Sequence, residues 1–237
     1  MRKNNEDSYL INKIVLSQAQ MEGDSKPPFI AAVADGVGGE AAGEVASHMA
    51  LELLAAVKLN RRTDLRSKIM NIHEKLKKYG INHNNSANMQ TTLCALAVDD
   101  EERAYVVNVG DSRMYRYRGG VIRQLSTDQS LVQMLYEQGK ITKDEKKYHA
   151  QKNVIFPVLG NVSDDPDPQI AEIEGGIQPG DLIILCTDGV SDHLTTGEFE
   201  EALARPMRLS KRLRLLLDTA IKNGSPDNVT VIGISVR

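Results

Sequence analysis

Residues 91–126, TTLCALAVDDEERAYVVNVGDSRMYRYRGGVIRQLS, contain four short runs rich in β-branched and aromatic residues. Only a few residues separate one run from the next, and Gly119-Gly120 makes a tight turn between the last two. Because these connections are too short to hold helices, the runs are predicted to pair as antiparallel strands. The stretch therefore favours antiparallel sheets over strict alternation of strands and helices.

The segments outside this stretch complete an α+β pattern. Apolar runs predict buried strands at 29–34 and 181–188 and a closing strand at 228–236. No repeat, linker or low-complexity tract interrupts the order, so residues 1–237 are predicted to form one α+β domain with helices layered on antiparallel sheets. The helices are expected at 40–59, 63–78, 129–138, 142–149, 196–204 and 208–223.

Composition excludes several classes of protein. The chain has 237 residues and a net charge of -3, so no overall field favours nucleic acid or an anionic membrane. No apolar run approaches the ~20 residues that span a bilayer, and the first residues lack the apolar core of a signal peptide. Cys94 and Cys186 lie in apolar runs and are predicted to be buried free thiols. We expect a cytoplasmic protein, or the cytoplasmic part of a longer one.

Acidic residues stand at the mouths of the predicted core strands. Taken singly, an Asp before Gly at a strand end is usually a turn former, because its side chain bonds the nearby backbone. Several such residues from strands of one sheet pair can instead converge at one end of the fold. The acids in question are Asp35 after FIAAVA, Asp111 after YVVNVG, Asp188 after LIILCT, Asp227 before NVTVIGI, and Glu6 and Asp7 before Tyr9-Leu10.

Converging carboxylates repel one another and lose solvation, so some would be protonated if they were left alone. A hard divalent cation removes this penalty, since Mg²⁺ and Mn²⁺ take oxygen ligands. No Cys or His stands at these strand ends, and the five histidines show no ligand spacing, which favours hard cations over zinc. The pattern therefore predicts a Mg²⁺ or Mn²⁺ site.

Eight motifs in order resemble the metal-dependent protein phosphatases of type 2C, and the ADGVGG form is similar to bacterial members. The resemblance covers nearly the whole chain. It implies a four-layer α-β-β-α sandwich of two antiparallel sheets flanked by helix pairs, with metal ions at one end. The motifs are RKNNEDS (2–8), ADGVGG (34–39), TTL (91–93), VGDSR (109–113), LSTDQS (125–130), LG (159–160), GDLIILCTDGVSD (180–192) and SPDNVTV (225–231).

The resemblance also implies roles for single residues. Asp35 is expected to bridge two metal ions. The Gly36 carbonyl and Glu6 are expected to complete the coordination of the second ion, partly through water. Asp188 and Asp227 are expected to hold the first ion. The remaining assignments are Asp111 with Asp188 at a third metal position, Asp7 behind the ligands, and Arg2 as the residue that holds the phosphate.

The sequence departs from the family pattern at three places. The family usually has an edge strand of about ten residues upstream of the arginine, and we expect that strand to be missing here. Val37 stands where animal members carry a histidine proposed as general acid. Gln129 replaces the usual histidine of its motif, within a segment, 126–155, that matches a flap beside the site.

Two hypotheses of function follow, from different classes. The first is an enzyme that hydrolyses phosphoserine and phosphothreonine in proteins through a metal-bridging water and reverses a bacterial serine/threonine kinase. The second is a pseudophosphatase, a phosphoprotein-binding module on the same fold. A phosphatase dedicated to one signalling protein is a variant of the first. The expected partners are phosphorylated proteins and a cognate kinase, and the chain is expected to be a monomer.

Overall fold

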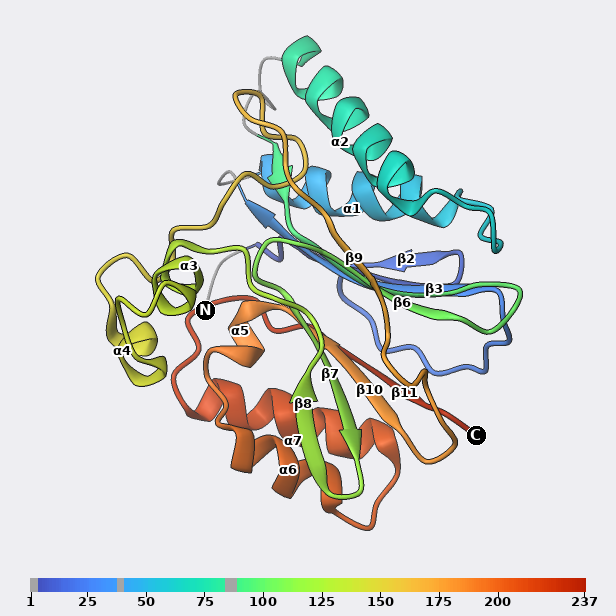
Figure 1. Ribbon diagram of the computed structural model, residues 1–237, viewed down its shortest axis with the longest axis vertical. Helices are drawn as coiled ribbons and strands as arrows, with labels where there is room; N and C mark the ends of the chain where they lie inside the picture. Colours follow the sequence, from blue (N-terminus) through green and yellow to red (C-terminus); the bar gives the residue numbers. More distant parts are fainter. Residues whose placement is uncertain (1–3, 38–40, 84–88) are drawn as a thin grey trace.

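The structure is a computed structural model that describes residues 4–37, 41–83 and 89–237. Its strands form two antiparallel sheets, which face each other in the middle of the molecule (Figure 1). The larger sheet has the order β2-β1-β3-β5-β6-β9, and a short strand, β4, pairs with the end of β3. These strands are β1 (Asp7–Ile11), β2 (Ile14–Leu16), β3 (Phe29–Val37), β4 (Gln90–Thr91), β5 (Leu93–Val98), β6 (Ala104–Val109) and β9 (Gln169–Glu172).

The smaller sheet has the order β11-β10-β7-β8. Among the described residues β11 pairs only with β10, so its other edge is open to a further strand. The expectation that an upstream edge strand is missing stays a prediction. The strands of this sheet are β7 (Arg113–Arg118), β8 (Val121–Gln124), β10 (Leu182–Cys186) and β11 (Val231–Ser235).

Helices cover the outer face of each sheet, as the four-layer prediction requires (Figure 1). Helices α1 (Ala41–Ala55) and α2 (Leu65–Asn82) pack on the larger sheet, and α6 (Thr196–Ala204) and α7 (Leu209–Lys222) pack on the smaller one. Local capping sets several helix starts: Asp64 accepts from the Ser67 amide, and Thr195 forms a capping box with Glu198. Three short helices lie at one end of the sandwich: α3 (Leu131–Glu137), α4 (Lys143–Tyr148) and α5 (Asp188–Ser191).

The alternation of side chains along β10 explains the layering. Ile183 and Leu185 point between the sheets, whereas Leu182, Ile184 and Cys186 point toward α6 and α7. Because both faces are covered, the strand is apolar along its whole length, which is why its sequence shows no polar alternation. Both cysteines are buried free thiols, as predicted. None of the described helices is long and apolar enough to cross a bilayer.

The stretch that first indicated antiparallel sheets is divided between the two sheets, so its four strands do not all pair in one series. β5 pairs with β6 and β7 pairs with β8, but β6 and β7 belong to different sheets. The chain crosses over at Gly110, whose φ of 101° lies in the left-handed region. The crossing brings Asp111 and Ser112 to one end of the sandwich.

Several element boundaries also differ from the prediction. The closing strand begins at Val231 and not at 228, and β3 continues through Asp35 to Val37. Asp188 begins the short helix α5 and does not end a strand. Two short strands, β2 and β9, were not predicted, because strands of three and four residues give too little periodicity to identify.

Candidate metal centre and active site

The first part of the site is built on two neighbouring strands. Asp7 on β1 and Asp35 on β3 are directly opposite each other in the sheet register. Thr92 holds the Asp35 backbone on both sides: its amide donates to the Asp35 carbonyl at 2.9 Å, and its hydroxyl accepts from the Asp35 amide at 3.0 Å. The same hydroxyl lies 2.8 Å from the Ser112 hydroxyl, next to Asp111. Thr92 therefore links two segments that carry predicted metal ligands.

Glu6 lies at the start of β1 and is buried. Its carbonyl accepts from the Gly36 amide at 3.1 Å and from the Ser47 hydroxyl at 2.6 Å. Its own amide donates to the Asn228 side chain at 3.0 Å. These bonds place Glu6 and Gly36 side by side, beside the loop that carries Asp227.

The smaller sheet supplies the opposite wall of the site. Asp188 follows β10, and the amide of Asn228 donates to the Asp227 carboxylate at 2.7 Å. A hydrogen bond of 2.9 Å from the Thr187 hydroxyl to the Asp7 carboxylate joins this wall to the larger sheet. The ends of both sheets therefore meet at one cluster of acids.

Gln129, the residue that departs from the family motif, supports the crossover next to Asp111. Its side-chain oxygen accepts from the Gly110 amide at 2.9 Å, and its backbone amide donates to the Gly110 carbonyl at 2.9 Å. Arg113 forms a bidentate ion pair with Asp128 and reaches Asp192 at 2.9 Å. The first residues of the 126–155 segment are thus hydrogen-bonded to the end of the sandwich where the acids lie.

The pKa values of these acids show that they converge. Burial raises the pKa of Asp35 well above its ordinary value, and the charges of Asp7, Asp188 and Asp111 raise it further. Burial, followed by the charge of Asp188, raises the pKa of Asp111 to about 8. Because each acid raises the pKa of others in the cluster, the metal-free site is electrostatically unfavourable.

Asp7 and Asp188 complete this electrostatic pattern. Burial, followed by the charges of Asp188 and Asp227, outweighs two threonine hydrogen bonds and raises the pKa of Asp7 to about 7. The pKa of Asp188 is raised by burial first and then by Asp192. Interaction between the two side chains also raises the pKa of Asp35 and lowers that of Asp188.

The residues present fit oxygen-ligated divalent cations. Two buried carboxylate oxygens, Asp7 Oδ1 and Asp188 Oδ1, have no hydrogen-bond partner in the described part of the chain. Buried polar atoms are normally paired, so an orphaned oxygen within a cluster of acids is the expected partner of a cation. The ligand atoms are spread more widely than those of a single compact site, since no three of these acids have oxygens within 4.8 Å of one another among the described residues.

The structure thus brings Glu6, Asp35, Gly36, Asp111, Asp188 and Asp227 to one end of the fold, together with Asp7. Arg2, the predicted phosphate holder, lies outside the described residues. Sequence reasoning missed the bonding roles of Thr92 and Asn228. Both stand inside the quoted TTL and SPDNVTV motifs, but a polar residue beside a strand gives no sign of which distant backbone it will hold.

The fold gives one histidine neighbours that its spacing in the sequence does not indicate. His73, Glu74 and Asp165 place ligand atoms within 4.8 Å of one another, although no ligand spacing was predicted for any histidine. Asp165 is distant from His73 in the sequence, so only the fold brings the two together.

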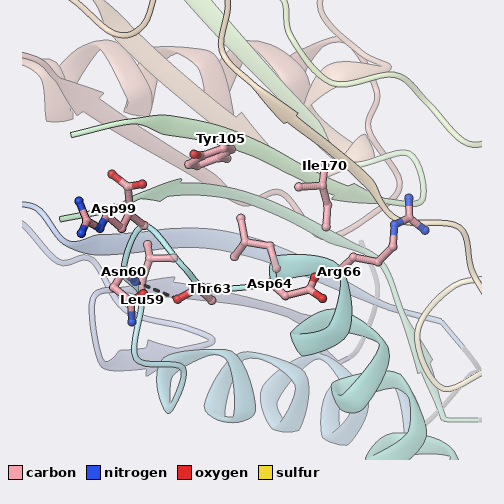
Figure 2. A pocket seen from close by; sticks show the side chains of 10 residues that line it. Leu59, Asn60, Thr63, Asp64, Arg66, Asp99, Tyr105 and Ile170 are labelled. Atoms are coloured by element: carbon pink, nitrogen blue, oxygen red, sulfur yellow. Dashed lines mark hydrogen bonds between the residues drawn. The ribbon is translucent and has the colours of Figure 1, made fainter. Parts of the chain in front are cut away.

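A separate pocket of about 340 Å³ lies between the start of α2, the β5–β6 turn and β9 (Figure 2). Its charged side chains are already paired: Arg66 with Asp167 at 2.8 Å, and Asp99 with Arg103 at 2.8 Å. None of the predicted metal ligands lines it, so it is distinct from the acid cluster. Its lining comprises Leu59, Asn60, Arg61, Thr63, Asp64, Leu65, Arg66, Asp99, Tyr105 and Ile170.

Gly189 provides a direct test of how tightly the segment after β10 packs against the loop before β11. A Cβ at this position would overlap the Asn228 carbonyl oxygen and lie 3.3 Å from the Asp227 Cβ. We expect Gly189→Ala to lower the free energy of unfolding by about 2 kcal/mol or more, because the crowding atom is rigid backbone. Gly197→Ala on α6 is the control, since a Cβ there meets nothing within 4 Å. Thermal unfolding of both variants measures the difference, and equal melting temperatures would contradict the close packing.

Two antiparallel sheets that present clustered carboxylates at one end indicate the class of proteins that hold divalent cations through oxygen ligands. The family model described as protein phosphatase 2C matches residues 17–221, and the chain belongs to this family. It is a protein phosphatase of a metal-dependent family, which confirms the resemblance and the predicted fold class and favours the enzyme over the binding-only alternative.

Named relatives agree with this assignment. The chain is 33% identical to the serine/threonine phosphatase stp of Listeria monocytogenes over 218 residues, covering 88% of this chain and 84% of the relative. The structure is similar to that of the S. agalactiae serine/threonine phosphatase, with a TM-score of 0.83, 25% identity and coverage of 100% and 95% of the two chains. It is also similar to the catalytic domain of the serine/threonine protein phosphatase PstP in complex with two manganese ions, with a TM-score of 0.76, 29% identity and coverage of 98% and 92%.

Proposed function

We propose that this phosphatase hydrolyses phosphoserine and phosphothreonine in proteins with the help of Mg²⁺ or Mn²⁺ held by the acid cluster. The observation that carries the proposal is the convergence of buried and half-buried acids from both sheets, two of which have orphaned oxygens. Divalent cations held there would lower the pKa of water so that it serves as a nucleophile at neutral pH, and would neutralise phosphoryl charge. The named serine/threonine phosphatases among the relatives support the substrate class.

The chain's own residues divide the work of holding the site. Asp35 lies between the acids of both sheets, which suits a ligand shared by two ions. Asp188 and Asp227 would complete the coordination of one ion. Glu6 and the Gly36 carbonyl would complete the coordination of the other. Asp111 with Asp188 would hold a third. Thr92 bonds both the amide and the carbonyl of Asp35. These bonds would hold the Asp35 carboxylate in position during turnover.

Substrate binding is assigned to Arg2, on the motif that carries it, because Arg2 lies outside the described residues. Arg2 would hold the non-bridging phosphate oxygens through its guanidinium fork, which matches phosphate geometry. No covalent phosphoenzyme is required, because Cys94 and Cys186 are buried and burial raises the pKa of both thiols. The leaving serine or threonine oxygen would take its proton from water, since Val37 cannot supply one.

The function is tested with the purified chain and three phosphorylated substrates, namely a phosphothreonine peptide, a phosphotyrosine peptide and an aryl phosphate. We expect release of phosphate from the phosphothreonine peptide with Mn²⁺ or Mg²⁺, much less from the phosphotyrosine peptide, and none with chelator. Tight binding of the phosphothreonine peptide without any release would instead support a pseudophosphatase. Metal-independent release would contradict the proposal.

We further propose that residues 1–237 act as a single catalytic domain, as a cytoplasmic monomer that reverses a serine/threonine kinase of the same cell. Three cores that share the two sheets support one domain, since neither sheet is covered on both faces without the other. A single cooperative unfolding transition and a monomeric mass in solution are the expected results. Two separate transitions would contradict a single domain.

A further inference from the structure

His73 on α2 is a fully buried histidine outside the acid cluster. Its Nδ1 lies 3.1 Å from the backbone nitrogen of Gly160, and its Nε2 lies 3.2 Å from an oxygen of Asp165. A backbone N–H can only donate, so Nδ1 must be the acceptor. The imidazole is therefore neutral, with its proton on Nε2 and donated to Asp165.

This tautomer argues against a metal ion among His73, Glu74 and Asp165, in spite of their ligand spacing. The Nε2 lone pair that a metal would need carries the proton, and the Nδ1 lone pair is occupied by Gly160. A metal-binding histidine normally donates its second ring N–H to an acceptor, which is the reverse of what is found here. The cluster is better explained as an anchor for the segment that contains Gly160.

The anchored segment leads directly to the proposed metal site. Leu159, the neighbour of Gly160, exchanges two backbone hydrogen bonds with Thr91, at 3.0 and 3.1 Å. Thr91 stands opposite Gly36 in the sheet register, and its hydroxyl donates to the Asp35 carbonyl at 2.9 Å. A short chain of hydrogen bonds thus runs from the His73 ring to the peptide between two proposed metal ligands.

Gly160 makes this connection rigid. Its φ of 86° lies in the left-handed region, and a Cβ there would overlap the carbonyl oxygen of Met89. The backbone at Gly160 packs against Met89, just before β4, and is held there by its hydrogen bond to His73. Loss of that bond would allow the segment to move. The position of Leu159, and through it that of Thr91, therefore depends on His73 as an acceptor.

We propose that neutral His73 is a positioning residue, which anchors Gly160 and thereby holds the Asp35–Gly36 peptide in its metal-binding position. The proposal rests on the proposed function, because it takes Asp35 and Gly36 as ligands. Protonation of His73 at Nδ1 would place its N–H opposite the Gly160 N–H. Two donors cannot bond each other, so the hydrogen bond that anchors Gly160 would be lost. Metal affinity is then coupled to the protonation of a residue that touches neither metal nor substrate.

The surroundings of His73 favour the neutral form. The charged groups that face it are Glu74 and Lys77 on α2 and Asp165 on the loop before β9. Burial lowers the pKa of His73 below 6.5 and outweighs the Asp165 hydrogen bond, which acts in the opposite direction. The folded state therefore prefers the neutral ring, and the anchor is present above pH 6.5 and lost as the pH falls toward the lowered pKa.

Three substitutions separate the two ring nitrogens. His73→Asn keeps an acceptor at the Nδ1 position, His73→Gln keeps a polar group only near the Nε2 position, and His73→Leu keeps neither. We expect the Gln and Leu variants to bind Mn²⁺ about tenfold more weakly at pH 7.5, by calorimetry, and the Asn variant to stay close to the unsubstituted protein. His48→Asn, a change of a half-exposed histidine on α1, is the control and should have no effect.

A second readout needs no metal. Amide hydrogen exchange at Gly160, Leu159 and Thr91 should accelerate about tenfold or more in the Gln and Leu variants. It should also accelerate in the unsubstituted protein as the pH falls below 6.5 and through the lowered pKa of His73, after correction for intrinsic exchange, whereas the Asn variant should lose this pH dependence. Equal exchange and equal metal affinity in all variants, or an Asn variant as impaired as the Leu variant, would overturn the proposal. Changed exchange at Thr91 in a protein that binds no Mn²⁺ would leave the anchor intact and refute the proposed metal site instead.

Discussion

Replacing Asp35 by Asn is expected to lower turnover of a phosphothreonine peptide by about a hundredfold or more, because metal ions contribute several kcal/mol of transition-state stabilisation. The same change should raise the stability of the metal-free protein. Asp35 is half-buried opposite Asp7, and the charges of Asp7 and Asp188 both raise its pKa. Removing one charge from that cluster relieves repulsion on the order of 1 kcal/mol.

The opposite signs of the two effects distinguish a ligand from a structural residue. If Asp35 were purely structural, its replacement would lower both stability and activity. If it is a metal ligand, the variant should lose activity and stabilisation by Mn²⁺, whereas the variant in chelator should be more stable than the unsubstituted protein. Asp218→Asn is the matched control, because Asp218 is an exposed residue of α7 paired with Arg214. Steady-state kinetics with thermal unfolding in chelator and in Mn²⁺ measure both effects. Unchanged turnover in the Asp35 variant would refute the metal assignment.

Removing metal is expected to make the protein less stable and its stability more dependent on pH. At a Mn²⁺ concentration about a hundredfold above the dissociation constant, binding adds about 2.7 kcal/mol to the free energy of unfolding. For a chain of this length that corresponds to a rise in melting temperature of roughly 5–10 °C. Thermal unfolding with chelator and with Mn²⁺ measures the shift.

The sign of the pH effect follows from the raised pKa values of Asp7, about 7, and Asp111, about 8, against an ordinary value of 3.8. Between pH 3.8 and 8 the folded metal-free protein binds protons that the unfolded chain has released. Its free energy of unfolding therefore falls as the pH rises through this window, and the stabilisation is lost above about pH 8. Bound cations replace those protons, so Mn²⁺ should flatten the dependence between about pH 6.5 and 8.5. Equal slopes with and without Mn²⁺ would contradict convergence of these acids.

Some acids of the site could be predicted from the sequence, and others could not. Asp35, Asp111 and Asp188 were identified because each follows an apolar strand run, a local pattern that burial on both faces imposes. The place of Asp7 behind the ligands stays a prediction, and the structure adds that Asp7 is a buried acid of the cluster with one orphaned oxygen. Its importance comes from its register with Asp35 and its bond to Thr187, and both partners are remote in the chain.

The sequence by itself determined the class of fold, the chain order of its main strands and helices, and the acids that gather at one end of the fold. It could do so because apolar periodicity and strand-end residues are local properties of the chain. Only the tertiary structure decided that the 91–126 stretch divides between two sheets at Gly110, and that His73 meets Gly160 and Asp165. Sheet membership and buried hydrogen bonds depend on which remote segments pack together, and no local pattern encodes that choice.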